Sequence, residues 1–193
     1  MSIICIVGGK YNGKDMVSNH LTKKYNFKRY GFADPMKEGV KHMFDFTDEQ
    51  VYGSLKEVID DRWNVTPREV MQVFGTELCQ FDLPKYLPAL APIGQAIWCH
   101  RFEIWYAKQP PNTNIVFNDC RFQHEATLTK RLGGHVWKII RPGYDVPTDS
   151  HKSENSLNMI PYDHLILNDS TLENLYSQID NLCDFNDSQN SIL

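Results

Sequence analysis

The sequence predicts an α/β fold with a central, mainly parallel sheet flanked by helices, because short apolar runs alternate with longer amphipathic stretches. Residues 2–7 are rich in isoleucine and valine, as expected of a strand buried on both faces of such a sheet. A glycine-rich turn follows at once, and a helix is expected from about Lys14. In this class of fold, ligands bind beyond the carboxyl ends of the strands.

Further strands and helices are expected along the chain. The later strands are expected at Ile115–Phe117, His135–Arg141 and His164–Leu167. Helices are expected to begin near Asp34 and Thr66, and to span about 93–107, 123–132 and 171–182. Residues 81–95, rich in proline and leucine, are expected to form a loop, and the polar tail from Asp184 is expected to fray.

The segment Thr66-Pro67-Arg68-Glu69 carries the clearest helix start. Thr66 can cap, Pro67 suits the first helical position, and Glu69 completes a capping box. The inward row of this helix is expected to include Val70, Phe74 and Leu78.

Composition and charge narrow the class of protein. The 193 residues favour one domain at roughly 150 residues per domain, and 41% apolar with 23% charged residues is ordinary for a globular protein. The 20 basic and 24 acidic residues give a net charge of −4, which offers no general surface for a nucleic-acid polymer. Any bound anion must therefore be held by a local cluster.

Cysteine spacing and apolar run length point to a cytoplasmic protein. The five cysteines include no pair at CxxC spacing, so neither a zinc site nor a disulfide framework is indicated. The run Ile3–Val7 is far shorter than the roughly 20 residues of a membrane span, and it lacks the basic flank of a signal peptide. We therefore expect no membrane partner.

The most specific motif is the segment Gly8–Lys14, which fits G-x-x-x-x-G-K between a strand and a helix. Glycines let successive N–H groups point at phosphate oxygens, the helix N-terminus adds partial positive charge, and Lys14 can reach the β- and γ-phosphates. The alternative is a strand–turn–helix connection with chance glycines. Asp15 stands where serine or threonine normally ligates Mg²⁺, and a carboxylate can also reach that ion.

A second acidic residue follows the strand Ile115–Phe117. Asp119 lies where phosphate-loop proteins place their second magnesium-organising acid. The alternative is an aspartate that caps the next helix. Arg121, two residues further along an extended chain, is expected to point toward the same place.

These motifs belong to an ordered series that resembles the deoxynucleoside monophosphate kinases of bacteriophages and large DNA viruses, within the adenylate and thymidylate kinase group. From residue 3 to about 182 the matching segments are Gly-Lys-Asp (13–15), Gly-Phe-Ala-Asp-Pro-Met-Lys-Glu (31–38), Thr-Pro-Arg-Glu-Val-Met-Gln-Val-Phe-Gly-Thr-Glu (66–77), Asp-Cys-Arg-Phe-Gln-His-Glu (119–125), Gly-Gly-His-Val-Trp-Lys-Ile-Ile-Arg-Pro (133–142), His-Lys-Ser-Glu (151–154) and Asn-Asp-Ser-Thr-Leu-Glu-Asn-Leu (168–175). The chain departs from the family at Gln80, where an arginine is common, and residues 81–97 form a longer stretch than usual.

The resemblance implies a three-layer P-loop NTPase fold, adenylate-kinase-like, with helices that bind the nucleoside monophosphate and a short lid. It implies one kinase domain over residues 1–183 and a polar tail at 184–193. Within the domain, the core is expected at about 1–33 and 113–183, the monophosphate-binding helical region at about 34–112, and the lid at about 142–158.

The resemblance also implies ATP-dependent phosphorylation of deoxynucleoside monophosphates to diphosphates for DNA precursor synthesis, with ATP and Mg²⁺. The catalytic candidates are Lys14, Asp119 and Arg121, and the metal candidates are Asp15 and Asp119. The ATP-binding candidates are Gly8, Gly9, Asn12, Gly13, Lys14, Asp15, Met16, Arg141 and Lys152. The monophosphate candidates are Asp34, Lys37, Arg62, Arg68, Gln72, Phe74, Trp98, Arg101, Arg121 and Glu125.

Several of these residues have a plain structural alternative. Arg68 is either a phosphate ligand in a first helical turn or a solvated surface arginine. Arg101 shares a helix row with Ile97 and Ile104, so it either contacts substrate phosphate or forms an internal salt bridge. The aromatic candidates Phe74, Trp98 and Trp63 either stack on a base or pack in the core.

Three other expected features are a base-reading residue, a helix-start acid and a lid. Gln72 could read a base edge. Glu125 either orients Arg121 or is an exposed acid at a helix start. Arg141 and Lys152 are candidates for contacts to the donor phosphates or to adenine, and the lid itself has a long surface loop as its alternative.

Other functions stay open at the level of sequence. One is a P-loop kinase of another small acceptor, of the phosphomevalonate or dephospho-coenzyme A type. Another is a non-catalytic nucleotide-binding protein or a GTPase-like switch, although the chain carries no Asn-Lys-x-Asp guanine motif. The expected partners are nucleotides, with no nucleic-acid polymer. A homodimer is left open, and the location is the host cytoplasm if the source is viral.

Overall fold

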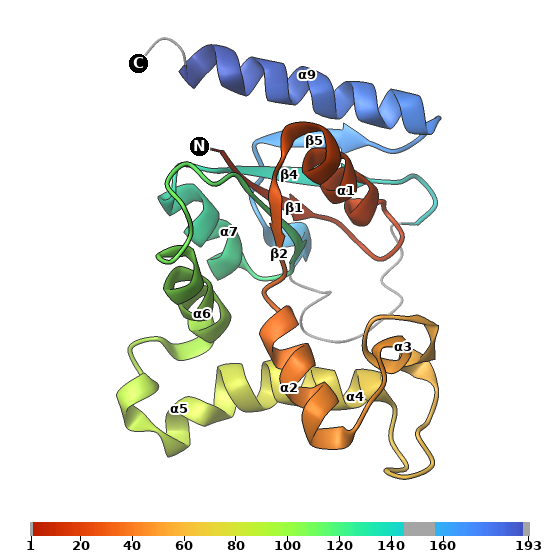
Figure 1. Cartoon of the computed structure of the whole chain (residues 1–193), viewed down its shortest axis with the longest axis vertical. Helices are drawn as coiled ribbons and strands as arrows, with labels where there is room; N and C mark the ends of the chain where they lie inside the picture. The colour runs from red at the N-terminus through yellow and green to blue at the C-terminus, as the bar shows by residue number, and fades with distance from the viewer. Residues whose placement is uncertain (1, 145–156, 191–193) are drawn as a thin grey trace. The chain divides into compact units, whose positions relative to one another are not determined.

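A computed structural model describes residues 2–144 and 157–190, and the chain divides into two compact units (Figure 1). Unit 1 comprises Met1–Tyr30 and Gln109–Leu193, and unit 2 comprises Gly31–Lys108. Unit 1 carries the sheet and unit 2 is helical. The expectation that the helical region binds a monophosphate stays a prediction.

Unit 1 is built on a five-stranded sheet whose neighbouring strands are all parallel. The strands are β1 (Ile3–Val7), β2 (Lys28–Tyr30), β3 (Ile115–Cys120), β4 (His135–Ile140) and β5 (His164–Leu167), in the order β2-β3-β1-β4-β5. The predicted parallel α/β class is therefore confirmed. The edge strand β2 was not expected, because its three residues include exposed Lys28 and Arg29 and carry no apolar run.

Helices cover both faces of this sheet (Figure 1). On one face, α1 (Lys14–Tyr25) and α9 (Leu172–Asn190) bury Leu21 and Ile179 against the strands. On the other, α7 (Gln123–Arg131) contacts β1 and β4. The predicted three-layer arrangement is confirmed, with the fully buried Trp137 at the centre of the core.

The ends of two predicted segments differ from expectation. The last helix was expected to stop near Leu182 with a frayed tail, but α9 continues to Asn190. Most of the predicted lid, residues 145–156 with Lys152, lies outside the described residues, so the lid stays a prediction. The described part of it includes a short 3-10 helix at Leu157–Met159.

Unit 2 is a small helical assembly with its own core. Its α-helices are α2 (Asp34–Phe44), α3 (Asp48–Val51), α4 (Pro67–Gln72), α5 (Leu83–Tyr86) and α6 (Ile97–Tyr106). Short 3-10 helices lie at Ser54–Glu57, Pro88–Leu90 and Gly94–Ala96. The core gathers Val40, Phe46, Val51, Val70 and Met71. The predicted capping box of Thr66 and Glu69 is present at the start of α4.

A π-helix connects α4 to α5 over Val73–Asp82, and it corrects two expectations. Residues 81–86 are helical instead of forming a loop. Leu78, expected four residues after Phe74 on the inward row, is 36% exposed. The reason is that i→i+5 hydrogen bonding widens the turn, so a four-residue step no longer returns to the same face.

The helix expected over about 93–107 begins at Ile97. Gly94 has a φ of 53° and starts a 3-10 turn before it. The buried residues of α6 are Cys99 and Phe102. The row that holds Arg101 and Ile104 is exposed, so Arg101 needs neither a ligand nor a salt bridge to offset burial.

No helix within residues 2–144 and 157–190 combines the length and the apolar character that crossing a bilayer requires.

An ionic cluster fixes α9 on α1. Asp180 accepts hydrogen bonds from His20 Nε2 at 2.7 Å, Lys24 Nζ at 2.8 Å and the Tyr25 hydroxyl at 2.8 Å. The His20 ring stacks on Tyr176 of α9 at 4.0 Å between centroids. Partial burial by itself would raise the pKa of Asp180, but the three donors outweigh it and hold the pKa at about 2.

We predict that Asp180→Asn lowers the free energy of unfolding by about 1–2 kcal/mol at pH 6, because three donors lose a charged acceptor. The pKa of the folded state lies below the ordinary value of 3.8, so the stabilisation is present above pH 4 and is lost as pH falls toward 2. Urea unfolding at pH 6 and pH 3 measures this. The difference in unfolding free energy between the parent and Asp180→Asn is expected to be smaller at pH 3 than at pH 6. A difference that is larger at pH 3 would contradict the role given to Asp180.

Candidate active site

The candidate site is built on the loop between β1 and α1, where Gly8 and Gly13 have no room for a side chain. A side chain at Gly8 would place its Cβ 2.7 Å from the Ile139 carbonyl oxygen of β4. Gly13 has a φ of 104°, and a Cβ there would lie 2.7 Å from Asn168 Nδ2. Both positions therefore need glycine for space, and Gly13 needs it for its backbone conformation as well.

The loop delivers a helix N-terminus that is not capped by a side chain. Gly13 is the N-cap of α1, so the first N–H groups of the helix have no side-chain acceptor from that residue. Lys14 extends back over the loop, where its Nζ donates to the carbonyl oxygens of Gly8 at 2.8 Å and Gly9 at 2.7 Å. An ammonium group and N–H dipoles together form an arrangement suited to phosphate oxygens.

Two asparagines brace this loop. Asn168, in the segment after β5, donates from Nδ2 to the carbonyl oxygen of Asn12 at 3.0 Å. Asn12 is only 3% exposed, and its own Nδ2 donates to the Ile139 carbonyl oxygen at 3.3 Å. The sequence placed Asn12 among the ATP ligands, but its amide holds the loop against β4. Sequence analysis matched Asn168 to the family but gave it no role, because a contact between residues 156 apart leaves no signal in the local sequence.

Asp15 is linked to the end of β3. Its Oδ1 accepts a hydrogen bond of 2.7 Å from Asn118 Nδ2. The Asn118 Oδ1 in turn accepts from Arg29 Nε at 3.0 Å. Asn118 is 5% exposed, and sequence analysis passed over it and Arg29 in favour of Asp119 and Arg121.

The register of β3 breaks at this point. Cys5 pairs with Phe117 and Val7 pairs with Cys120, so Asn118 and Asp119 together lie opposite the single residue Ile6. Such a bulge changes the alternation of side chains along a strand. Asn118, the residue that donates to Asp15, lies in this bulge together with Asp119.

Asp15 and Asp119 are the residues that the sequence predicts to hold a magnesium ion. Mg²⁺ is usually held by one or two carboxylates, with phosphate oxygens and water as further ligands. Among the described residues, no cluster of three or more histidine, cysteine, aspartate or glutamate side chains could hold a metal by itself. The assignment of the two aspartates to Mg²⁺ stays a prediction.

Glu125 is buried and holds the start of α7. Its Oε2 accepts the backbone N–H of Arg121 at 2.6 Å and of Phe122 at 3.0 Å. Burial and the nearby Asp119 charge raise the pKa of Glu125 to about 8, against the opposing effect of the backbone donors and Arg121. At 3% exposure it is not the exposed acid of the alternative interpretation, and it positions the backbone of Arg121.

The remaining candidates for ATP binding are Met16, Arg141 and Lys152. Met16 is 40% exposed in the first turn of α1. The Arg141 guanidinium lies over the Tyr144 ring at 4.5 Å. Lys152 lies outside the described residues, so its expected phosphate contact stays a prediction.

Most monophosphate candidates lie in unit 2, and several have protein partners there. Lys37 Nζ is 3.3 Å from Asp34 Oδ1, and it also lies over the Tyr52 ring at 5.2 Å. Arg68 pairs with Glu57 at 3.3 Å. Gln72, on the last turn of α4, is partly buried.

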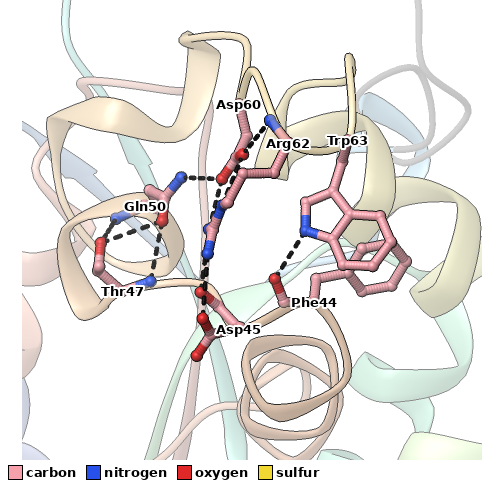
Figure 2. A network of polar contacts seen from close by, with 7 residues as sticks. All are labelled: Phe44, Asp45, Thr47, Gln50, Asp60, Arg62 and Trp63. Atoms are coloured by element: carbon pink, nitrogen blue, oxygen red, sulfur yellow. Dashed lines mark hydrogen bonds and ion pairs between the residues drawn. The ribbon is translucent and has the colours of Figure 1, made fainter.

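Arg62 belongs to the polar network shown in Figure 2. Its Nε and Nη2 donate to the two carboxylate oxygens of Asp60 at 3.0 and 2.7 Å, and Nη1 donates to Asp45 Oδ2 at 3.0 Å. Gln50 also donates to Asp60, which is 7% exposed. These bonds use the donors that a phosphate would need, so a contact of Arg62 with the acceptor requires the network to open.

The aromatic candidates are used within unit 2. Trp98 donates from Nε1 to the Gly75 carbonyl oxygen of the π-helix at 2.9 Å. Phe74 packs edge-on against Phe44 at 5.6 Å between centroids, beside the core. Trp63 donates to the Phe44 carbonyl oxygen at 2.8 Å. Packing within the unit explains these three positions without a bound base.

We predict that Gly13→Ala lowers affinity for ATP at least 10-fold. A Cβ at this residue clashes with the Asn168 amide and strains a left-handed backbone, so the loop must move. Isothermal titration calorimetry with ATP measures the effect.

Gly133→Ala is the matched control, since Gly133 also has a positive φ, of 75°, with nothing within 4 Å of the added Cβ. It shares the backbone strain but lies far along the chain from the loop, so ATP affinity is expected within about 2-fold of the parent, with a stability cost of about 1 kcal/mol. Equal losses of affinity in both variants would contradict the role given to the loop.

Comparisons with known proteins identify the family of this chain. A sequence model of the family described as deoxynucleotide monophosphate kinase matches residues 41–179. A protein of Acanthamoeba polyphaga mimivirus, provisionally named a deoxynucleotide monophosphate kinase, is 40% identical over 186 residues, which cover 93% of this chain and 94% of that protein. The deoxynucleotide monophosphate kinase of Enterobacteria phage T4 is 29% identical over 157 residues, covering 75% of this chain and 60% of its own length. That of Escherichia phage RB69 is 28% identical over 146 residues, covering 72% and 54%. The chain belongs to the deoxynucleotide monophosphate kinase family.

Proposed function

We propose that this protein transfers the γ-phosphoryl group of ATP to a deoxynucleoside monophosphate, producing a diphosphate for DNA synthesis. The observation that carries the proposal is the loop of β1 and α1, where Lys14 and an uncapped helix N-terminus converge beside Asp15. Family membership supports the identity of the acceptor.

The residues of unit 1 suit the donor. Backbone N–H groups of the loop bind the phosphates of ATP, and the Lys14 ammonium exchanges its Gly8 and Gly9 carbonyl bonds for bonds to phosphate oxygens. Asp15 and Asp119 hold Mg²⁺, which offsets the charge that builds on the transferring group. Arg121, positioned through its N–H by Glu125, stabilises the same charge.

No general base is required. The acceptor phosphate is already anionic at neutral pH, so the protein needs only to align the two nucleotides and neutralise charge. Asp34, Lys37, Arg68, Gln72 and Arg101 of unit 2 are the proposed sources of monophosphate contacts. Arg62 and the aromatic side chains are assigned to the fold of that unit.

We predict that the protein releases ADP from ATP in the presence of deoxynucleoside monophosphates, and that Lys14→Ala lowers kcat/KM roughly 10²–10³-fold, as for loss of one donor to a transition-state charge. Coupled ADP-release kinetics over the common deoxy- and ribonucleoside monophosphates measure both. Phosphomevalonate and dephospho-coenzyme A serve as acceptor controls. Turnover with either of these in place of the monophosphates, or tight ATP binding without turnover of any acceptor, would refute the proposal.

A second prediction separates Arg62 from Arg68 in unit 2. Arg68→Ala is expected to raise the KM for the monophosphate roughly 10-fold, because one charged hydrogen bond to the acceptor is lost. It is expected to lower the melting temperature less than Arg62→Ala does, because it breaks only the ion pair with exposed Glu57. Arg62→Ala is expected to lower the melting temperature, because buried Asp60 loses its partner. Differential scanning fluorimetry and steady-state kinetics measure both variants. If Arg62→Ala melts like the parent and raises KM more than Arg68→Ala, the assignments are reversed.

We further propose the host cytoplasm as the location if the source is a virus, and nucleotide-sized ligands as the partners. Sedimentation of the purified protein tests whether it forms a homodimer.

A further inference from the structure

We propose that Asn118 is a positioning residue for Asp15: anchored by Arg29, its side-chain amide fixes the orientation of the Asp15 carboxylate that the magnesium–ATP complex meets. The inference rests on the proposed function only in taking magnesium–ATP as the ligand. It assigns roles to Asn118 and Arg29, which neither the motif nor the family comparison marks.

We call the two hydrogen bonds that link Arg29, Asn118 and Asp15 the relay. The chemistry of these three groups fixes the orientation of the Asn118 amide. The Asp15 carboxylate is an acceptor and the Arg29 guanidinium is a donor only, so the amide between them has one possible orientation. Its NH₂ group must face Asp15, at 2.7 Å, and its oxygen must face Arg29, at 3.0 Å. The exchange of N and O that usually leaves an asparagine ambiguous is excluded here by its two partners.

Burial makes the amide a rigid element. Asn118 is 5% exposed and lies in the bulge of β3, so its side chain is held by the sheet. Arg29 comes from β2, which pairs with β3 in parallel through Arg29 and Val116. The relay therefore runs across two neighbouring strands to the first turn of α1, and none of its members lies in unit 2.

The relay also explains how aspartate works at a position normally held by serine or threonine. A carboxylate has two equivalent oxygens, and without a second partner either of them could turn toward a cation. Because Asn118 engages Oδ1, the other oxygen, Oδ2, is the one left for a cation. The neutral amide holds the carboxylate through a hydrogen bond and leaves its negative charge in place for a cation, whereas a lysine in the same place would offset that charge and repel the cation.

The test compares ATP affinity with Mg²⁺ and in EDTA, by calorimetry, so that it does not depend on turnover. In Asn118→Ala, the factor by which Mg²⁺ strengthens ATP binding is expected to fall at least 5-fold, while affinity in EDTA changes less than about 2-fold. Arg29→Met, a change at an exposed residue, is expected to shift the factor in the same direction by a smaller amount. It keeps the inference testable if Asn118→Ala does not fold.

Asn114→Ala is the matched control. Asn114 precedes β3, and its Oδ1 accepts the Ser2 N–H at 2.8 Å, so the variant also loses an asparagine hydrogen bond. For this variant, the factor by which Mg²⁺ strengthens ATP binding (the magnesium factor) is expected to equal that of the parent.

A double-mutant cycle decides whether Asn118 acts through Asp15. In an Asp15→Ser background, Asn118→Ala is expected to change the magnesium factor less than 2-fold, because there is no carboxylate left to orient. Additive losses in the cycle, or unchanged factors in folded Asn118→Ala and Arg29→Met, would overturn the inference. Failure of the proposed function is a separate result, seen as a parent protein that binds magnesium–ATP but transfers no phosphate to a monophosphate.

Discussion

The close packing of the phosphate loop against β4 and the segment after β5 is the constraint on which the candidate site depends. Gly8 has no room for a side chain beside the Ile139 carbonyl, and Gly13 has none beside Asn168. This packing exists only because β1 lies between β3 and β4 in a parallel sheet, so that its carboxyl end and theirs meet at one edge. The N-terminus of α1, with Lys14 and Asp15 in its first turn, lies at that edge.

Asp60 and Asn118 are buried polar residues with hydrogen-bond partners, and the identity of those partners separates their roles. Asp60 is buried in unit 2 and is satisfied by Arg62 and Gln50, as Figure 2 shows. An arginine held in this way stabilises a fold, because breaking the pair leaves an uncompensated carboxylate. Asn118 is buried as deeply, but its partners are the exposed Arg29 and Asp15 of the first turn of α1. The network of Asp60 therefore ends inside the unit, and the relay of Asn118 ends at the ligand.

Local signals were sufficient for much of the fold and for the glycine-rich loop between β1 and α1. The phosphate loop, the capping box at Thr66, the four longer strands and the start of α7 are all encoded within a few residues of sequence, and each was predicted. Three features had no such signal. Strand β2 has two exposed residues and is held by pairing with β3, the π-helix follows residues that are compatible with an ordinary helix, and the bulge at Asn118 exists only relative to β1.

The sequence by itself determined that a strand, a glycine-rich loop with Lys14 and a helix follow one another, because backbone freedom, dipole and charge act within that short segment. It also determined the family, through motifs in a fixed order. Only the tertiary structure decided which polar residues support the loop, since Asn118 lies 103 residues from Asp15 and Asn168 lies 156 residues from Asn12. It likewise showed Arg62 to be bound within its own unit. Pairing of distant side chains depends on strand order and register, and neither can be read from the residues on one segment alone.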